Sequence, residues 1–538
     1  MIPGLKGRGR WAGVVILASF LAAAWFLLLP QPLPRLPFGP SLPPLLTNPG
    51  RFGQWDPPIP VPLVPAAAAL RPRSGRVLLW AADARTTFES DGNTITATVD
   101  VRRRDVSAAN VSATHHNMFC PGLSLSSNGR VFVTGGSSSD KFSIYDEDEE
   151  AWIEGPPLKL GRGYHAQVTL ADGRIFTIGG SWSGSMGGKN GEIFDSAAGA
   201  WTTLPGCSSE VLLTNDNRGA FTSDNHAWLF AWSDNSVFQA GPSSAMNWFD
   251  VANTGRTIRA GYRDDDSDSM NGNAIMYDAL RGKILTLGGA QSYSGAPATS
   301  NAHIITLGEP FTPPRVERLD NMHSARVYAN SVILPTGDVF INGGATWAQQ
   351  WTDANATWVP EIWSSRTHRF TEMARMQIPR TYHSFALLLP DATVLVGGGG
   401  LCWIECEDES INHENVQVFR PPYLFTDRGR PAERPRILEV STDKVSPGEQ
   451  LLVTTDTWIV ELVLIRYASA THSINTDQRR IKLRHEPLNI TKEGEVETWN
   501  HSLTLPSDPG VMPPGYWMLF AVNTQDTPSL ATTILVQI

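Results

Sequence analysis

The stretch DGRIFTIGG, residues 172–180, joins a turn, a short apolar strand and a pair of glycines. The pattern recurs as NGRVFVTGG (128–136), RGKILTLGG (281–289), TGDVFINGG (336–344) and DATVLVGGG (391–399), with weaker copies in SGRVLLWAA (74–82) and SDNSVFQAG (233–241). Seven copies spaced by roughly 45 to 55 residues are typical of a closed kelch-type β-propeller with four strands in each blade. We therefore expect an all-β fold built on a seven-bladed propeller.

The two ends of the chain lack this repeat. Residues 1–29 combine a basic start with an apolar run, which predicts an uncleaved signal anchor or, as the alternative, a cleaved signal peptide. Residues 30–50 are rich in proline and predict an extended stalk, and the propeller is expected over residues 51–432. Residues 433–538 alternate in short strands and predict an immunoglobulin-like β-sandwich.

Composition and sequons indicate the setting of the protein. The net charge is -10, with acidic and basic residues interspersed, so no basic stripe is available for phosphate and a nucleic-acid partner is not expected. Glycosylation sequons at Asn110, Asn355, Asn489 and Asn500 agree with an extracellular protein, either secreted or membrane-anchored. We expect it to be a monomer.

Three of the four cysteines, Cys207, Cys402 and Cys406, are expected to lie outside any functional site. Cys402 and Cys406 are close enough in sequence to form a small disulfide loop in an oxidising compartment, with a metal-binding pair as the weaker alternative. Cys207 is expected to be a free or buried thiol without a role.

The fourth cysteine, Cys120, falls at a special position of the repeat. Counting back 15 residues from the first glycine of each pair gives one position per blade, and these positions lie on one ring around the propeller axis. They hold Cys120, Tyr164, Asn273, Tyr328 and Tyr382. Cys120 and Tyr164, in adjacent blades, are therefore expected to be neighbours in space, although a bulky residue here can also simply fill the channel, as is favoured for Tyr328 alone.

The tyrosines on this ring, together with the adjacent His383, suggest a metal site. A phenolate is anionic at neutral pH only beside a cation, and nitrogen and oxygen donors suit Cu(II) better than zinc. Tyr382 and His383 can serve one site only where the strand begins or bends.

A second imidazole could come from several places. His165, His115 and His116 lie in the propeller, and each of them is individually more often an ordinary hydrogen-bonded histidine. His472 lies in the polar stretch RYASATHSINTDQRR of the C-terminal domain, and a hairpin from that domain could enter the propeller channel and deliver it.

Longer motifs connect the chain with a known family. They include MFCPG, RGYHAQVTLADGRIFTIGGSWSG, SDNHAWLF, YHSFALLLPD, RYASATHSINTDQRRI and PGYWMLFAVN. In these motifs the chain closely resembles the galactose oxidase-like copper radical oxidases. The resemblance does not extend to that family's N-terminal carbohydrate-binding domain, because the residues before 51 are assigned to anchor and stalk.

The resemblance implies one Cu²⁺ ion with four ligands, Tyr164, Tyr382, His383 and His472. It also implies a self-processed thioether bond between Cys120 and Tyr164, a radical on the Tyr164 ring, and Trp182 stacked over that ring. The implied reaction oxidises a primary alcohol to an aldehyde and reduces O₂ to H₂O₂, with Tyr382 as the general base.

The positions that match the family's substrate pocket are Arg263, Tyr293, Ser294, Phe88, Phe119, Tyr328 and Trp351. Arg263 is expected to bind sugar hydroxyls. Ser294 stands where the family has a glutamine, and Tyr328 and Trp351 stand where it has phenylalanines. Loss of the glutamine donor should weaken discrimination among hydroxyls, and the added aromatic surface favours aryl or aliphatic alcohols beside galactose-type sugars.

Two other functions stay open. In the glyoxal oxidase branch, the same copper-radical centre would act on small aldehydes, although the Trp182 and Arg263 matches argue against this. In a non-catalytic kelch propeller that binds protein or glycan partners, the cysteine, tyrosines and histidines of the ring would be incidental.

Overall fold

The computed structural model describes residues 48–538 except 89–91, 403–408 and 494–495. The predicted anchor, residues 1–29, and the stalk as far as residue 47 lie outside this range. The stalk was expected to run to residue 50, but Pro49 already begins a short helix, α1 (Pro49–Phe52), which Asn48 caps by accepting the N–H of Gly50. No helix in the described residues is long and apolar enough to cross a membrane.

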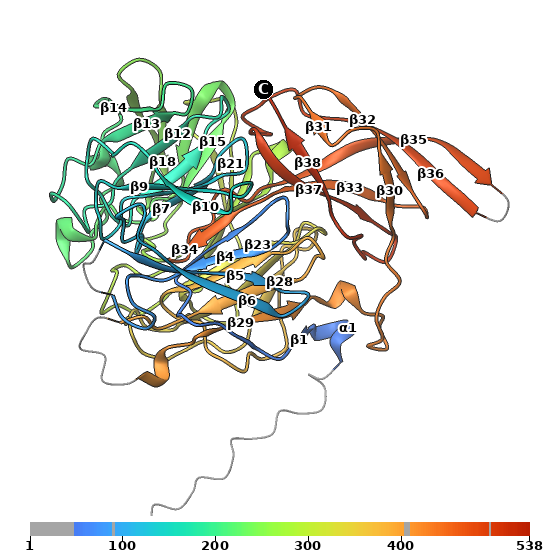
Figure 1. Cartoon of the computed structure of the whole chain (residues 1–538), viewed down its shortest axis with the longest axis horizontal. Helices are drawn as coiled ribbons and strands as arrows, with labels where there is room; N and C mark the ends of the chain where they lie inside the picture. Colours follow the sequence, from blue (N-terminus) through green and yellow to red (C-terminus); the bar gives the residue numbers. More distant parts are fainter. Residues whose placement is uncertain (1–47, 89–91, 403–408, 494–495) are drawn as a thin grey trace, which may run out of the picture. The chain divides into compact units, whose positions relative to one another are not determined.

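The all-β class and the seven-bladed propeller are confirmed (Figure 1). Within the described residues each blade is an antiparallel sheet of four or five strands. Blade one consists of β3 (Ala67–Leu70), β4 (Val77–Trp80), β5 (Thr94–Asp100) and β6 (Asp105–Val111), and blade two of β7 (Gly122–Leu125), β8 (Val131–Thr134), β9 (Phe142–Asp146) and β10 (Ala151–Glu154). Blade three consists of β11 (Ala166–Thr169), β12 (Ile175–Ile178), β13 (Gly191–Asp195) and β14 (Ala200–Leu204), and blade four of β15 (Leu229–Trp232), β16 (Ser236–Gln239), β17 (Ala245–Asp250) and β18 (Arg256–Tyr262).

The remaining blades are five to seven. They are β19 (Asn273–Asp278), β20 (Lys283–Leu287), β21 (Ala302–Thr306) and β22 (Arg315–Arg318); β23 (Val327–Ile333), β24 (Val339–Ala345), β25 (Glu361–Trp363) and β26 (Phe370–Glu372); and β27 (Ser384–Leu388), β28 (Val394–Gly398) and β29 (Asn415–Arg420), completed by β1 (Gln54–Trp55) and β2 (Ile59–Pro60). Short 3₁₀ turns lie at Ser209–Leu212, Gly219–Phe221, Ser233–Asn235, Ala279–Arg281, Glu409–Ile411 and Pro422–Leu424.

The seventh blade closes the ring by joining the two ends of the propeller. Its outer strand β1 comes from the beginning of the described chain and pairs with β29, with Trp55 opposite Phe419. The Trp55 ring packs 4.9 Å from Phe419 and its Nε1 donates to the carbonyl of Ala374 at 2.8 Å. Pairing the last blade with the first strand removes an exposed sheet edge.

Buried arginines fix where the inner strands of three blades begin. In blades three, six and seven, a guanidinium donates at 2.9 to 3.0 Å to the carbonyl of a glycine that ends the second strand, and also to a side chain on the third strand. The arginines are Arg162, Arg326 and Arg380; their glycines are Gly179, Gly343 and Gly398; and their third-strand partners are Glu192, Glu361 and Asn415. This contact explains the Arg-x-Tyr context of Tyr164, Tyr328 and Tyr382.

At or just before the start of the inner strand, the backbone passes through a left-handed residue. Residues with positive φ at this place include Cys120 (59°), Tyr164 (62°), His226 (55°), Tyr328 (63°) and His383 (66°), in blades two, three, four, six and seven. A left-handed conformation is strained for a side chain of this size, by about 1–3 kcal/mol. The second glycine of each pair allows the close approach: a Cβ on Gly136 would lie 2.3 Å from the carbonyl oxygen of Phe119.

The ring residue predicted for blade seven is wrong by one position. It is His383 rather than Tyr382, because one more residue separates Arg380 from Gly398 than separates Arg162 from Gly179. The extra residue lies in a turn in which Ser384 N–H donates to the carbonyl of Thr381 at 3.2 Å. As a result two consecutive side chains, those of Tyr382 and His383, reach the same site.

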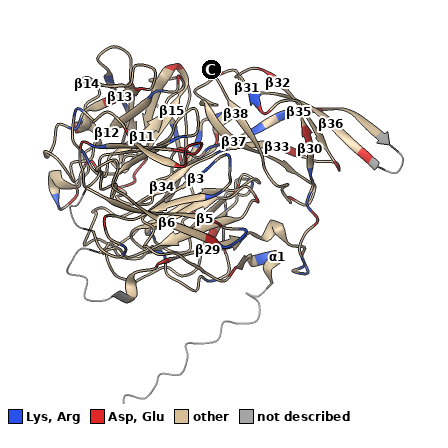
Figure 2. Cartoon of the chain, in the orientation of Figure 1, with Lys and Arg blue, Asp and Glu red and all other residues tan. Residues whose placement is uncertain are grey.

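The C-terminal domain is a separate sheet, in which the long strand β35 is shared by two halves. Its strands are β30 (Ile437–Val440), β31 (Lys444–Val445), β32 (Gln450–Thr455), β33 (Glu461–Arg466), β35 (Arg480–Glu493), β36 (Val496–Thr504), β37 (Gly515–Val522) and β38 (Thr532–Val536). Acidic and basic residues are interspersed along both this domain and the propeller (Figure 2).

The segment between β33 and β35 enters the propeller. Its strand β34 (Ser469–Thr471) pairs with β3 as a fifth strand of blade one (Figure 2). Beyond β34, the carbonyl of Ser473 accepts from Asn273 at 3.0 Å, and Gln478 donates to the carbonyl of Ser331 at 2.8 Å. These contacts with blades one, five and six carry His472 to the propeller axis.

The closure of the ring should depend on Trp55. Replacing Trp55 by Ala removes a side chain that is only 9% exposed, and the cavity should lower the free energy of unfolding by about 3–5 kcal/mol. Urea unfolding followed by tryptophan fluorescence would measure it. Trp347→Ala is the matched control, because Trp347 is 41% exposed; equal losses in both variants would contradict the closing role of Trp55.

Candidate metal centre

The side chains of Tyr164, Tyr382, His383 and His472 meet where the inner strands of blades three and seven begin. The ring centroids of Tyr382 and His383 are 3.9 Å apart, those of His383 and His472 4.7 Å, and those of Tyr164 and His472 4.9 Å. The hydroxyls of Tyr164 and Tyr382 form a short hydrogen bond. The exposed fractions of the four residues are 5%, 3%, 1% and 3%, so the cluster is almost dry.

The two imidazoles present nitrogen lone pairs to this cluster. His383 Nδ1 is 2.7 Å from the carbonyl of Gly400 and must donate to it, which leaves Nε2 as the acceptor. That buried Nε2 has no hydrogen-bond partner among the described residues. His472 Nδ1 bonds to Thr471 Oγ1 at 2.6 Å, and its Nε2 faces Cys120 Sγ at 3.4 Å. Histidines held by one ring nitrogen with the other free are typical of metal ligands.

Burial keeps every donor of the cluster neutral when no cation is present. It raises the pKa of the Tyr164 and Tyr382 phenols well above the ordinary value. It lowers the pKa of His383 to about 3 and that of His472 well below its ordinary value. A divalent cation would take the place of two phenol protons, so two phenolates and two imidazoles around it form a neutral set. The residues therefore fit Cu(II).

Cys120 lies against Tyr164, as the repeat spacing predicts. The Cys120 thiol is hydrogen-bonded to the Tyr164 side chain, and the Tyr164 N–H donates to the Cys120 carbonyl at 2.9 Å. Burial raises the pKa of this thiol well above its ordinary value. On another side, the Trp182 ring lies 4.7 Å from the Tyr164 ring at an angle of 32°. Tyr164 thus contacts both Cys120, its neighbour by the repeat spacing, and Trp182, which the family resemblance places over its ring.

His226 belongs to this centre and was missed by the sequence reading. Its ring lies 4.6 Å from that of Tyr164 and stacks on His472 at 5.4 Å. Its Nε2 is 3.1 Å from Tyr293 Oη, which is 2.8 Å from Tyr382 Oη. Tyr293, expected in the substrate pocket, is therefore a buried member of the centre. The signal for His226 was present: counting back 15 residues from Gly241, in the weak fourth copy, reaches it.

Aromatic rings form a collar around the centre. We define it as Trp182, Phe119, Phe88 and Trp351, with centroid separations of 6.2, 4.4 and 6.4 Å between successive members. The ring centroid of Trp351 lies 6.5 Å from that of Tyr382, which belongs to the centre. Phe119 is fully buried, whereas Trp351 is 42% exposed, so the outer edge of the collar is an accessible apolar surface.

The polar groups beside the collar bond to one another. Ser294 Oγ donates to Gln350 Oε1 at 3.0 Å, and Gln350 Nε2 donates to the carbonyl of Tyr293 at 3.1 Å. Tyr328 Oη donates to the same carbonyl at 2.6 Å, and its ring lies behind Tyr382 at 5.0 Å. Nothing in the sequence pattern pointed to Gln350.

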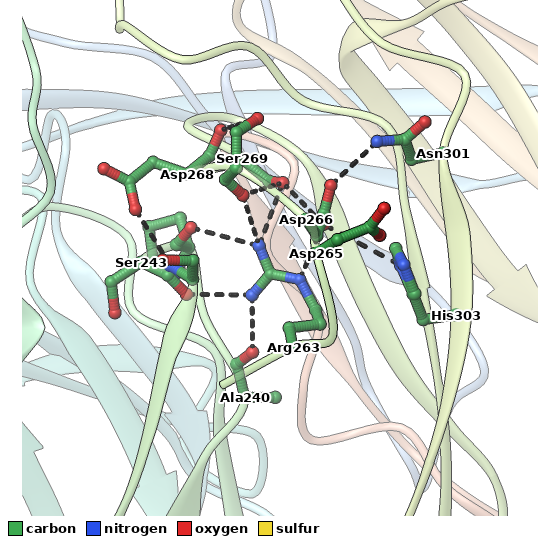
Figure 3. A network of polar contacts seen from close by, with 12 residues as sticks. Ala240, Ser243, Arg263, Asp265, Asp266, Asp268, Ser269, Asn301 and His303 are labelled. Carbon is green, nitrogen blue, oxygen red and sulfur yellow. Dashed lines mark hydrogen bonds and ion pairs between the residues drawn. The ribbon is translucent and has the colours of Figure 1, made fainter. Parts of the chain in front are cut away.

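The expectation that Arg263 binds substrate hydroxyls is wrong. Arg263 is 0% exposed and its guanidinium is surrounded by acceptors from its own loop and from residues 240–243 (Figure 3). Nε donates to Asp266 at 2.8 Å. The other acceptors, at 2.8 to 3.4 Å, are the carbonyls of Ala240, Pro242, Ser243 and Ser267 and the hydroxyl of Ser269. Every nitrogen is engaged within the protein, so this arginine holds loops together.

The other candidate histidines lie outside the centre. His116 uses both ring nitrogens, on Ser143 Oγ at 2.9 Å and on the carbonyl of Gly135 at 2.8 Å. His165 Nε2 bonds to Thr134 Oγ1 at 2.9 Å; its buried Nδ1 has no partner among the described residues, but His165 belongs to no group of His, Cys or carboxylate side chains there that could hold a metal ion. His115 is exposed. They are ordinary hydrogen-bonded or surface histidines, as the sequence alone favoured.

Of the remaining cysteines, Cys207 is a buried free thiol, as expected. Burial raises the pKa of this thiol to about 12. Cys406 lies outside the described residues, so the disulfide between Cys402 and Cys406 stays a prediction.

Comparisons with known proteins agree with this picture. The family model described as "Galactose oxidase-like, Early set domain" matches residues 434–536, and "Glyoxal oxidase N-terminus" matches residues 277–423. The galactose oxidase of Gibberella zeae is 46% identical over 492 residues, covering 90% of this chain and 71% of the relative. The aldehyde oxidase GLOX of Vitis pseudoreticulata is 28% identical over 394 residues, covering 70% and 72%.

A solved structure is similar throughout. It is described as a novel fungal alcohol oxidase with catalytic diversity among the AA5 family, in complex with copper. It is 40% identical, covers 91% of this chain and 100% of its own, and has a TM-score of 0.85. The fold and the site define a propeller protein with a buried tyrosine–histidine metal centre. Because of its similarity to these relatives, the chain belongs to the galactose oxidase-like family of copper radical oxidases.

The structural role of Arg263 can be tested by Arg263→Met. The change leaves Asp266 buried without its partner and should lower the free energy of unfolding by roughly 3–5 kcal/mol. Among folded molecules, the ratio of kcat/KM for galactose to that for benzyl alcohol should stay unchanged. Urea unfolding and steady-state kinetics measure the two quantities. A selective loss of galactose oxidation at unchanged stability would show that Arg263 does bind the sugar.

Proposed function

We propose that this protein oxidises primary alcohols to aldehydes, with O₂ as electron acceptor and H₂O₂ as the second product. The observation that carries the proposal is the buried centre, in which two phenols and two neutral imidazoles converge around the unpartnered Nε2 of His383. Tyr164, Tyr382, His383 and His472 are the proposed copper ligands. The relatives' printed names, galactose oxidase and alcohol oxidase, support the same reaction.

Bound copper would supply one of the two one-electron acceptors that alcohol oxidation requires, and oxidised Tyr164 the other. We propose that Cys120 bonds to the Tyr164 ring by a thioether. Its formation removes the thiol hydrogen and one ring hydrogen, as two protons and two electrons that pass to O₂. The sulfur substituent donates electron density and makes Tyr164 easier to oxidise, while Trp182 covers the ring at 4.7 Å.

The other residues of the centre have roles that follow from their hydrogen bonds. Tyr382 Oη would take the proton of the alcohol hydroxyl. Tyr293 Oη at 2.8 Å and His226 Nε2 beyond it at 3.1 Å extend a hydrogen-bonded path away from Tyr382. Tyr164 Oη, bonded to Tyr382 Oη, would accept the hydrogen of the alcohol carbon.

The preferred substrates we propose are aryl or aliphatic primary alcohols. Arg263, which was expected to bind sugar hydroxyls, is buried and engaged, and Ser294, which stands in place of the family's glutamine, donates its own hydroxyl to Gln350. The accessible edge of the collar is aromatic, and a substrate ring packed against such a group gains about 0.5–1.5 kcal/mol beyond its buried area. Galactose is then a poorer substrate, because its hydroxyls lose hydrogen bonds to water without matched partners.

Aldehyde oxidation at the same centre is the second candidate. It is favoured by the match of residues 277–423 to the glyoxal oxidase model and by the relative named an aldehyde oxidase. Methylglyoxal distinguishes it from alcohol oxidation, since faster peroxide production from this aldehyde than from benzyl alcohol would select the second candidate.

We propose that the protein works outside the cell. This rests on the sequence of residues 1–29 and on the sequons, of which Asn110 lies on the exposed face of β6.

The central experiment loads the protein with copper in air and measures H₂O₂ from benzyl alcohol, butanol, galactose and methylglyoxal. We expect benzyl alcohol to be oxidised with the highest kcat/KM. Trp351→Ala should lower that value about tenfold, a loss of ~1.4 kcal/mol, and leave butanol less affected. Trp347→Ala, outside the collar, is the control. Peroxide from none of the four substrates would refute the oxidase and leave a binding propeller.

The role of the thiol is tested by Cys120→Ser. The variant should bind copper with nearly the same affinity, because all four proposed ligands remain, but turn over at least ~100-fold more slowly, a loss of ~2.7 kcal/mol. Intact-mass spectrometry should show that copper-treated wild type has lost two hydrogen atoms and that the variant has not. Full turnover in the variant would exclude a catalytic thioether.

A further inference from the structure

Lys189 is a buried lysine that the proposed reaction does not use. Its side chain is 1% exposed, and Nζ donates to the carbonyl of Ser183 at 3.0 Å and to the carbonyl of Gly161. Ser183 directly follows Trp182, and Gly161 lies three residues before Tyr164. One ammonium group therefore joins the two backbone segments that carry the contacting rings of Trp182 and Tyr164.

The loop that carries Trp182 is held at both ends by other contacts as well. Ser181 donates through N–H and Oγ to the carboxylate of Asp224 at 2.8 and 2.7 Å, and its Oγ accepts from the Gly187 N–H at 3.0 Å. The backbone carbonyl of Lys189 accepts from the Gly179 N–H at 2.9 Å and from Arg162 at 3.2 Å. The Lys189 side chain adds the contact that ties the end of the loop to the carbonyl next to Trp182 and to the Tyr164 segment.

The backbone around the ammonium leaves no spare room. Gly184 has φ of 72°, and a Cβ on it would lie 2.4 Å from the carbonyl oxygen of Gly161 and 2.8 Å from Lys189 Nζ. A Cβ on Gly163, next to Tyr164, would lie 2.8 Å from the Trp182 ring. The Trp182 loop is therefore seated directly on the Tyr164 segment, with the ammonium between their carbonyls.

The charged neighbours of Lys189 explain why a cation is tolerated here. Burial and the Arg162 guanidinium lower the pKa of Lys189 to about 8, while the carboxylates of Asp224 and Glu192 act in the opposite direction. At neutral pH the side chain keeps its proton and its three N–H donors. An apolar side chain of equal length would leave both carbonyls without these donors.

We propose that Lys189 is a positioning residue that holds Trp182 against Tyr164 and so prolongs the life of the oxidised tyrosine. The inference rests on the proposed function, because it assumes that Tyr164 is the residue that becomes oxidised. Trp182 covers Tyr164 from the side of the collar, and a loosened loop would admit water and small reductants to the ring.

The test uses Lys189→Met, with Lys141→Met as the matched control, since Lys141 pairs with Glu154 away from the centre. In the metal-free protein, hydrogen–deuterium exchange of residues 181–189 should accelerate in Lys189→Met only. In the oxidised, copper-loaded protein, the optical absorption of the Tyr164 radical should decay about tenfold faster, with copper affinity unchanged. Unchanged exchange and decay would overturn the proposal.

A double variant separates positioning from general stability. If Lys189 acts through Trp182, then adding Lys189→Met to Trp182→Ala should not shorten the radical lifetime further; an equal additional loss would overturn the proposal. Gly184→Ala provides a second route, because its Cβ would displace the loop with Lys189 present, and the same exchange signature is expected. If wild type forms no Tyr164 radical, the proposed function fails, whereas the exchange experiment still decides whether Lys189 holds the loop.

Discussion

A buried guanidinium bonded to a glycine carbonyl sets where an inner strand of this propeller begins. Arg162, Arg326 and Arg380 each make this contact, and each also needs an acceptor on the third strand of its blade. Because an unpaired guanidinium in the interior is costly, arginine, glycine carbonyl and third-strand acceptor come together or not at all. Two or three residues after each arginine comes a left-handed residue, Tyr164, Tyr328 or His383, and two of these three, Tyr164 and His383, are proposed ligands of the metal centre.

Two departures from the repeat turn this ring of side chains into a site. One extra residue in blade seven brings Tyr382 and His383 to the same point, and a segment of the C-terminal domain fills the axis and adds His472. The side chains of Tyr164, Tyr382, His383 and His472 are then all buried and neutral. A divalent cation would compensate the two negative charges that remain when both phenols release their protons. Trp182 and Lys189 belong to the support of this centre rather than to its ligands.

The proposed preference for aryl or aliphatic alcohols depends on which side chains are free to contact a substrate. The guanidinium of Arg263 donates its hydrogen bonds within the protein, among others to loop carbonyls, and the Ser294 hydroxyl donates to Gln350. What remains accessible is the edge of aromatic rings, above all Trp351.

The repeat in the sequence was enough to predict the propeller, and it placed Cys120 beside Tyr164, because a period of one blade maps directly onto neighbouring positions in a ring. The same spacing also marks His226, 15 residues before Gly241, but only in the weak fourth copy of the repeat. The register of blade seven could not be read, since GGGG offers more than one glycine pair. The sequence left the entry of His472 into the channel as one of several possible sources of an imidazole, and tertiary structure decided among them. The burial of Arg263 and the pairing of Gln350 with Ser294 were decided by tertiary structure alone. Each depends on carbonyls and side chains supplied by segments distant in sequence, and no local pattern encodes which of them will meet.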